Sequence, residues 1–150
     1  MKFQYSYCTV IGRIFIAEEN GAITGIAFKD INANYKETPT IKKTYFELQE
    51  YFNGKRKYFD IPLYLNGTKF QKKVWEALTA IPYGKTCSYK DIAIAIGNEN
   101  AYRAVGMANN TNPIAIIIPC HRVIGSNGSL TGYAGGLNIK QKLLQIENVI

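Results

Sequence analysis

Residues Ser88–Asn110 have the sequence SYKDIAIAIGNENAYRAVGMANN, which predicts two short helices joined by a turn. Ser88, followed three residues later by Asp91, has the spacing of a capping box that starts a helix. Gly97 is suited to end this helix, because glycine adopts the left-handed backbone of a helix C-terminus without strain. We expect the second helix to span about residues 101–109. The pair is typical of a helix-turn-helix, although many small helical domains also contain adjacent short helices.

The half of the chain that contains this pair is strongly basic. The 150 residues carry a formal net charge of +7, and the sequence pI is near 9.3. Residues 69–150 hold nine Lys and Arg but only four Asp and Glu, whereas residues 1–68 hold nine and seven. Such a surplus is typical of nucleic-acid binding, since lysine and arginine release counterions when they neutralise phosphates. A solvated basic surface is the alternative interpretation.

Composition excludes several classes of protein. With 47% hydrophobic and 19% charged residues, the chain has the balance of a packed globular protein. Its longest purely apolar stretch, Ile114–Ile118, is too short to span a bilayer, and Met1–Tyr7 lacks the apolar region of a signal peptide. We therefore expect a cytoplasmic protein with no membrane partner. Three widely spaced cysteines and a single histidine argue against a disulfide framework and a zinc site.

The first half of the chain begins with strand-like sequence. Phe3–Ile11 and Arg13–Glu18 are rich in β-branched and aromatic residues. Asn20-Gly21 precedes another such run, Ile23–Phe28, and this dipeptide favours a tight hairpin turn. We expect an antiparallel sheet.

A helix and a linker complete this half. Thr38 is a suitable N-cap, and the apolar residues after it recur at helical spacing until Asn53-Gly54. Residues 55–67 are basic, then contain proline, and are expected to form a linker. The predicted domains are residues 1–68 and residues 69–150, and the fold class is α/β.

The second half is predicted to be mainly helical. Thr68 can cap one helix, and a last helix is expected over Asn138–Glu147. Between them lie the helix pair, the apolar stretch and a glycine-rich loop over residues 125–136. This order places the loop between the apolar stretch and the last helix.

The apolar stretch leads into Pro119-Cys120-His121-Arg122, which contains the only histidine. Proline disfavours helix, so we expect Cys120 at the end of a buried extended segment. A nucleophilic cysteine needs a group that takes its proton or stabilises the thiolate. Adjacent side chains of an extended segment point to opposite sides, so His121 would need a bent backbone or a bridging water. Four acids in this half are available to orient the imidazole: Glu76, Asp91, Glu99 and Glu147. Glu147 is preferred because it closes an apolar helix.

Two other interpretations of Cys120 stay open at this point. A cysteine after an apolar run is more often a small buried hydrophobic residue than a nucleophile. The second interpretation is that the protein is a Cys-His-Glu hydrolase that acts on esters or peptides. A hydrolase would show repeated turnover and direct contact between the base and the sulfur. The basic half and the lack of an evident oxyanion loop argue against the hydrolase.

Several motifs together resemble one family. They are Asn112-Pro113, Ile118-Pro119-Cys120-His121-Arg122-Val123, Tyr133-Ala134-Gly135-Gly136-Leu137 and Leu143-Leu144-x-x-Glu147. This set closely resembles the O6-alkylguanine-DNA alkyltransferases, also called methylated-DNA–protein-cysteine methyltransferases. The resemblance covers essentially all of residues 69–150, whereas residues 1–68 fit the variable N-terminal domain of the family only in length and in the order of strands and helix.

The resemblance implies a fold and a reaction. The fold would be a small RNase H-like N-terminal domain with an antiparallel sheet and a helix, plus a mainly α-helical, winged-helix-like C-terminal domain with the helix-turn-helix. The reaction would be direct reversal of DNA damage, by irreversible and stoichiometric transfer of the alkyl group from O6-alkylguanine to Cys120. It would follow minor-groove binding and base flipping. The alternative is a non-catalytic helix-turn-helix protein that binds DNA or senses lesions.

The resemblance also assigns roles to residues. Cys120 would accept the alkyl group, His121 would act through a water as base, and Glu147 would orient His121. Tyr89 would contact the extruded guanine and Asn112 would tie the recognition helix to the acceptor segment. Arg103 would fill the vacated space in the base stack. The implied DNA-binding residues are Tyr89, Lys90, Ala101, Tyr102, Arg103, Gly106 and Ser126, and the implied guanine-binding residues are Cys120, Val123, Tyr133 and Ala134.

Expectations about partners follow from the same resemblance. The partner would be double-stranded DNA that contains O6-alkylguanine, and the protein would act as a monomer. No cofactor and no metal are expected, since the zinc ligands that some family members carry near the N-terminus are missing.

Overall fold

The computed structural model describes residues 1–150, which form two compact units. The first unit consists of Met1–Leu65 and Pro113–Ala115, and the second of Asn66–Asn112 and Ile116–Ile150. The predicted boundary after residue 68 thus lies near one junction of the units, but the chain also returns briefly to the first unit. None of the helices is long and apolar enough to cross a membrane.

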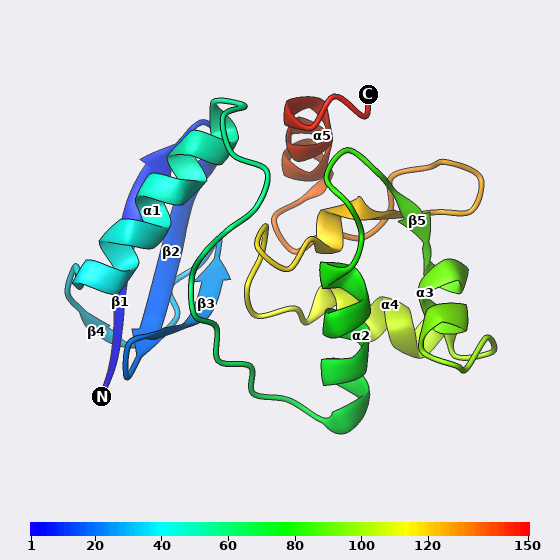
Figure 1. The fold of residues 1–150 in the computed structure, drawn as a ribbon, viewed down its shortest axis with the longest axis horizontal. Coiled ribbons are helices and arrows are strands. Elements are labelled where there is room, and N and C mark those ends of the chain that lie inside the picture. Colours follow the sequence, from blue (N-terminus) through cyan, green and yellow to red (C-terminus); the bar gives the residue numbers. More distant parts are fainter. The chain divides into compact units, whose positions relative to one another are not determined.

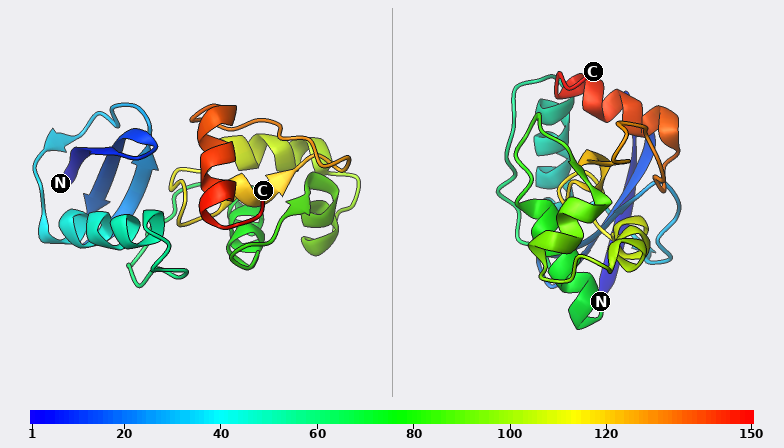
Figure 2. Two further views of the ribbon diagram at one scale, coloured as in Figure 1. Left: turned by 90° about the horizontal axis from the view of Figure 1, so that it is seen from above. Right: turned by 90° about the vertical axis from the view of Figure 1, so that its right-hand side faces the viewer.

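The first unit is a four-stranded sheet with one helix on it. The strand order is β3-β2-β1-β4, in which the first three strands are antiparallel and β4 pairs in parallel with β1. Helix α1 packs along this sheet (Figures 1 and 2). The bounds are β1 Lys2–Thr9, β2 Gly12–Glu19, β3 Ala22–Ala27, β4 Asn34–Tyr35 and α1 Pro39–Phe52. The expected sheet and helix are confirmed, with a two-residue parallel strand added at one edge.

The two hairpin turns of the sheet differ in how well they were predicted. Asn20 and Gly21 both have positive φ, 53° and 82°, which is the conformation that a tight turn between twisted strands requires. The first turn was placed wrongly, because β1 ends at Thr9 and not at Ile11. The Thr9 hydroxyl donates to the carbonyl of Gly12 at 2.7 Å and accepts from the Ile11 amide at 3.2 Å. Thr9 therefore closes the turn.

Two segments far apart in the sequence pair with β3. The Ile23 amide donates to Pro62, and the Tyr64 amide donates to Ile23, so part of the expected linker is bound to the sheet. Further along β3, Ile26 donates to Pro113 at 2.9 Å and accepts from Ala115 at 3.1 Å. An exposed strand edge is a template for pairing with other chains. These two segments satisfy backbone groups of β3 within the protein itself.

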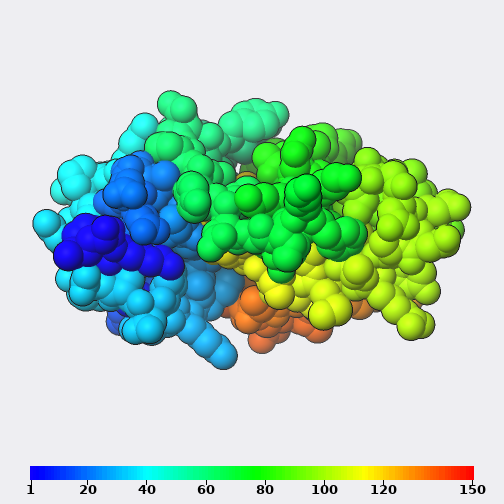
Figure 3. Space-filling view, turned by 90° about the horizontal axis from the view of Figure 1, so that it is seen from below, coloured from blue at the N-terminus to red at the C-terminus, as the bar shows by residue number.

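The second unit is mainly helical. Figure 1 shows α2, α3, α4 and α5 with the short strands between them, and Figure 3 shows one face, on which α2 is green and α3 and α4 are yellow-green. Strands β5 and β6 pair in parallel. The bounds are α2 Lys69–Thr79, β5 Cys87–Ser88, α3 Tyr89–Ala95, α4 Tyr102–Asn110, the 3₁₀ turn η1 Cys120–Arg122, β6 Val123–Ile124 and α5 Leu137–Ile146. A sheet with one helix, followed by a mainly helical unit, is the arrangement expected from the sequence.

Local capping explains where these helices begin. Thr68 and Gln71 form a capping box at α2, and Ser88 and Asp91 form one at α3. Each box satisfies amide donors that have no partner within the helix. Gly97 follows α3 with a φ of 80°, as predicted.

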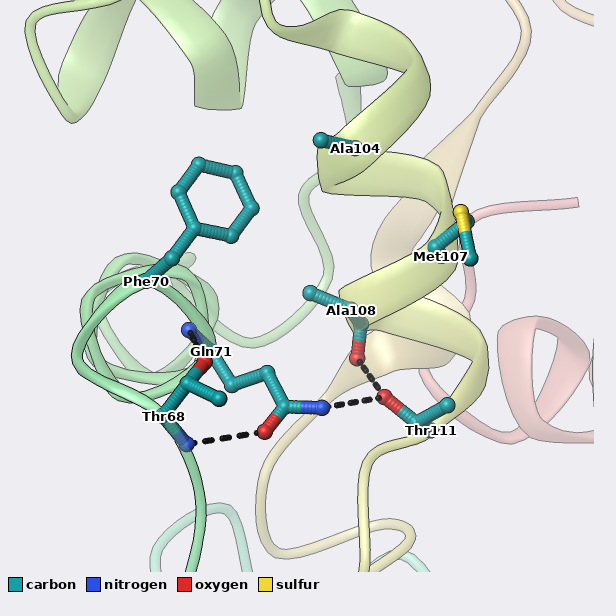
Figure 4. A pocket seen from close by; sticks show the side chains of 7 residues that line it. All are labelled: Thr68, Phe70, Gln71, Ala104, Met107, Ala108 and Thr111. Carbon is teal, nitrogen blue, oxygen red and sulfur yellow. Dashed lines mark hydrogen bonds between the residues drawn. The ribbon is translucent and has the colours of Figure 1, made fainter.

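A buried tryptophan of α2 forms a hydrogen bond to α4. The Trp75 indole N–H donates to the Ala108 carbonyl at 2.9 Å, and the Gln71 amide approaches Thr111 at 3.4 Å. Beside these bonds, the two helices line a shallow pocket of about 240 Å³ with Phe70 and Met107 among its walls (Figure 4). The bonds fix the position of α4, which is the second helix of the predicted helix-turn-helix.

Candidate active site

The chain bends sharply at Cys120. Pro119 has φ −81° and ψ 64°, and the Cys120 amide donates to the Ile118 carbonyl at 2.8 Å, which is the geometry of an inverse γ-turn. A 3₁₀ turn over Cys120–Arg122 follows. The expected extended conformation of Cys120 is therefore wrong at this residue. The Cys120 side chain is buried, with 6% of the residue exposed.

His121, Arg122 and Glu147 form one buried cluster. His121 Nε2 lies 2.6 Å from Glu147 Oε2, and both side chains are completely buried. The Arg122 guanidinium donates to both carboxylate oxygens of Glu147, at 2.8 and 3.1 Å, and to the carbonyl of Ile81 at 2.7 Å. The Gly84 amide donates to the same carboxylate. Of the four candidate acids, Glu147 is thus the one that contacts the imidazole.

Burial favours the neutral forms of Cys120 and His121. Burial raises the pKa of the Cys120 thiol, whereas a hydrogen bond with Asn112 and the charge of Lys140 oppose that rise. Burial also lowers the pKa of His121, and the positive charge of Arg122 adds to this effect against the attraction of Glu147. A neutral imidazole retains a lone pair, so His121 can accept a proton.

Asn112 connects the end of α4 to the acceptor segment. Its Nδ2 donates to the Ile118 carbonyl at 2.7 Å, two residues before Cys120, and its side chain also bonds to the thiol. The backbone between these points includes Ile116 at a φ of 74°, a conformation rare for a β-branched residue. Asn112 therefore supports a strained part of the chain.

The glycine-rich loop lies against α3. The Tyr89 hydroxyl donates to the Thr131 carbonyl at 3.1 Å, and the Thr131 hydroxyl donates back to Tyr89 at 3.1 Å. A side chain at Gly106 would stand about 3.9 Å from the Tyr89 ring. Tyr89 thus lies between α4 and the loop.

The residues expected to bind guanine differ in burial. Val123 is completely buried, whereas Ala134 is exposed. Burial and the nearby Cys120 raise the pKa of Tyr133 well above its ordinary value, so its phenol stays protonated. The side chain of Tyr133 is therefore close to the acceptor cysteine.

The residues expected to bind DNA lie on the outside of the second unit. Tyr102 and Arg103 are exposed on α4, Lys90 is exposed on α3 and Ser126 is exposed in the loop. None of these four contacts the His121–Glu147 pair. Ala101 and Gly106 are half-buried.

One buried charged residue next to the site was missed in the sequence. Lys140 on α5 is completely buried, and its ammonium donates to the carbonyls of Val123 and Thr131, both at 2.6 Å. A signal was present, because Lys140, Leu143 and Leu144 have the spacing of one helix face. Lysine is so rarely buried that its apolar neighbours alone did not identify it as inward-facing.

No group of three or more His, Cys, Asp or Glu side chains is placed to hold a metal ion. All three cysteines are free thiols.

The fold and the site define a helix-turn-helix protein with a candidate nucleophilic cysteine. Two family models match the chain, one described as "6-O-methylguanine DNA methyltransferase, DNA binding domain" over residues 69–149 and one as the "ribonuclease-like domain" over residues 3–65. The chain belongs to the 6-O-methylguanine DNA methyltransferase family. The family expected from the sequence motifs is confirmed.

Individual relatives agree with this assignment. The chain is 49% identical to the constitutive methylated-DNA–protein-cysteine methyltransferase of Bacillus subtilis, over 94% of this chain and 92% of that protein. It is 64% identical to a methylated-DNA–protein-cysteine methyltransferase of Methanosarcina barkeri, over 67% of this chain and 64% of that protein. Among solved structures, Mycobacterium tuberculosis OGT in complex with DNA matches with a TM-score of 0.90 and 43% identity, over 97% of this chain and 92% of that one.

Proposed function

We propose that this protein repairs double-stranded DNA by moving the alkyl group of O6-alkylguanine onto Cys120. The observation that carries the proposal is the position of Cys120, which immediately precedes the buried His121–Glu147 pair in a helix-turn-helix unit. Membership in the family and the names of its relatives support the same reaction. The enzyme is then a methylated-DNA–[protein]-cysteine S-methyltransferase.

The chemistry assigns a task to each buried group. His121 takes the Cys120 proton through a bridging water, and Glu147 orients the imidazole and stabilises its charged form. The thiolate displaces O6 from the alkyl carbon, so a sulfur–carbon bond forms as a carbon–oxygen bond breaks. The guanine leaves with the electron pair and takes up a proton, for which the Tyr89 hydroxyl is the proposed donor.

Access to the O6 carbon requires that the nucleotide leave the helix. Unstacking costs a few kcal/mol, and less at a mispaired lesion. We assign to Arg103, which is exposed on α4, the task of filling the space that the base vacates. Tyr102, Ala101 and Gly106 of the same segment would face the minor groove, with Lys90 and Ser126 contacting the backbone. Val123, Tyr133 and Ala134 would bind the flipped base.

The product limits each molecule to one reaction. A thioether is a poor leaving group, and no group near Cys120 is placed to hydrolyse it. The protein should therefore act once and titrate lesions stoichiometrically, as a monomer and without a cofactor. Its three free thiols support a reducing compartment, for which we propose the cytoplasm.

Intact-protein mass spectrometry tests the proposal. The protein is incubated with a duplex that contains one O6-methylguanine, and peptides are then mapped. We expect one added methyl group per chain, on the peptide that contains Cys120, and no addition in Cys120→Ser. An unmodified protein that still binds the duplex would overturn the repair function and leave the lesion-sensing alternative.

A further inference from the structure

Lys140 joins three parts of the second unit. Its ammonium donates to the carbonyl of Val123, three residues after the acceptor cysteine, and to that of Thr131 in the glycine-rich loop. A third carbonyl, that of Gly132, lies at 3.5 Å. The Thr131 carbonyl also accepts from Tyr89 of α3. Lys140 thus connects the acceptor segment with the loop that carries Tyr133, and that loop with α3.

The charge of Lys140 has no acidic partner. No carboxylate lies within ion-pair distance of its ammonium, and the one buried acid of the site, Glu147, already contacts His121 and Arg122. Burial of an unpaired ammonium is costly, and it lowers the pKa of Lys140 to about 8. A buried ammonium that is bound only by carbonyls lowers stability, and its position beside the acceptor segment points to a role in the reaction.

The ionisable groups near Lys140 come from three elements. Cys120 and His121 belong to η1, Tyr133 belongs to the loop, and Tyr89 on α3 is reached through Thr131. Cys120 is the one whose reactive form is an anion, because Tyr133 stays protonated. The positive charge of Lys140 stabilises that anion and disfavours the protonated form of His121.

We propose that Lys140 is a positioning residue of alkyl transfer, which holds the guanine-binding loop against the acceptor segment and stabilises the Cys120 thiolate by its charge. This inference rests on the proposed function. During transfer the thiol loses its proton, the sulfur electron pair forms the new bond to carbon, and the pair of the broken carbon–oxygen bond leaves with guanine. The charge of Lys140 acts before this displacement, because it raises the fraction of Cys120 that is present as the thiolate.

Variants at Lys140 separate the two roles. Lys140→Met removes the charge and the hydrogen bonds, whereas Lys140→Arg keeps a charge and donors. Lys142→Met, at an exposed position of the same helix, is the matched control. The reaction of iodoacetamide with Cys120 is followed against pH by peptide mapping, and methyl transfer is followed at saturating duplex.

In Lys140→Met we expect the Cys120 labelling profile to move to higher pH by about one unit, which corresponds to about a tenfold lower thiolate fraction near neutral pH. Methyl transfer at saturating duplex should slow by at least about tenfold, while Kd for undamaged duplex stays within about twofold of the parent. Lys140→Arg should restore most of the labelling profile, and Lys142→Met should match the parent protein. A labelling profile and transfer rate unchanged in Lys140→Met would overturn the proposal.

A reciprocal measurement does not depend on the folding of Lys140 variants. If Lys140 and the Cys120 thiolate stabilise each other, the coupling must act in both directions. Titration of the lysine side chains by NMR should show that the pKa of Lys140 is lower in Cys120→Ser than in the parent, and an equal pKa would contradict the coupling. Both titration experiments are independent of methyl transfer, so absence of transfer in the parent protein would overturn the proposed function alone.

Discussion

Glu147 Oε2 lies 2.6 Å from His121 Nε2, and neither side chain is exposed to solvent. The same carboxylate also neutralises Arg122. The pair therefore consists of an imidazole that can accept a proton and a carboxylate that stabilises the resulting cation. The positive charge of Arg122 opposes part of the effect of Glu147 on the pKa of His121. Glu147 is the only carboxylate that contacts His121 and Arg122, so a substitution of any of the three residues changes the electrostatic environment of the other two.

Glu147→Gln should lower both stability and activity. The substitution leaves the Arg122 guanidinium buried without its counter-charge, and breaking a buried ion pair costs about 3–5 kcal/mol. Urea unfolding measures that loss, and methyl transfer should slow by about 100-fold or more. Glu76→Gln, at an exposed position of α2, is the control and should change neither quantity. Equal stability of Glu147→Gln and the parent would contradict the role of the cluster.

The stability of the protein should fall as the pH decreases below about 6.5. Burial lowers the pKa of His121 from its ordinary value of 6.5, so the unfolded chain takes up a proton at a pH where the folded protein does not. The stabilising contribution of neutral His121 is present above pH 6.5 and is lost between that value and the lower pKa of the folded state. Urea unfolding at several pH values between 5 and 7.5 measures how the free energy of unfolding depends on pH. This range extends about 1.5 units below and about one unit above the ordinary pKa of 6.5. The slope should become flatter in His121→Asn, and an unchanged slope would assign it to other groups.

The three thiols should react with iodoacetamide in order of their exposure. Cys8 is exposed, Cys87 is half-buried and Cys120 is buried. Burial also raises the pKa of Cys87 and that of Cys120, which reduces their thiolate fractions. Time-resolved peptide mapping at pH 8 should show Cys8 labelled first and Cys120 last, and the differences should shrink in urea. Labelling of Cys120 ahead of Cys8 would show that its thiolate is stabilised in the free protein.

Arg103→Ala should impair repair of duplex DNA while sparing the chemistry of Cys120. Without the side chain that fills the base stack, more of the unstacking cost of a few kcal/mol opposes flipping. We expect methyl transfer from a duplex to slow by about tenfold or more, and transfer from a single-stranded oligonucleotide to change much less. Arg56→Ala, which removes the ion pairs of Arg56 with Glu47 and Glu50 in the first unit, serves as control. Equal slowing on both substrates would refute the base-stack role.

Trp75→Phe should lower stability by about 1 kcal/mol. The variant keeps an aromatic ring but loses the indole N–H that donates to Ala108. The Ala108 carbonyl keeps a second donor, the Thr111 hydroxyl at 3.2 Å, which limits the loss. Urea unfolding measures the change, with Tyr58→Phe at an exposed position as control. A loss of less than about 0.3 kcal/mol would show that the Thr111 hydroxyl compensates fully.

The features predicted correctly from the sequence are mostly local. Caps at Thr38, Thr68 and Ser88 and the turn at Asn20-Gly21 depend on a few neighbouring residues, and each has the expected geometry. The contact between His121 and Glu147 was also predicted, because Glu147 ends an apolar helix and its side chain was therefore expected to face the protein interior.

The features that were missed depend on distant parts of the chain. The pairing of Leu63 with Ile23 and the two-residue strands have no pattern long enough to recognise. The bend at Cys120 follows from the ψ of Pro119, which proline chemistry does not fix as it fixes φ. The burial of Lys140 requires three carbonyls from two other segments, and no propensity of lysine indicates them.

Residues Pro113–Ala115 belong to the first unit, although they lie within the stretch 69–149 that the DNA-binding family model matches. The N-terminal and C-terminal modules, residues 3–65 and 69–149, therefore cannot be exchanged independently. Ile114 continues the hydrogen bonding of β3, and the chain then proceeds within a few residues to Cys120. A fragment that begins at residue 66 would lose the strand that these residues complete and would expose three apolar positions. Any chimera with a foreign N-terminal module would need an edge strand that accepts this segment.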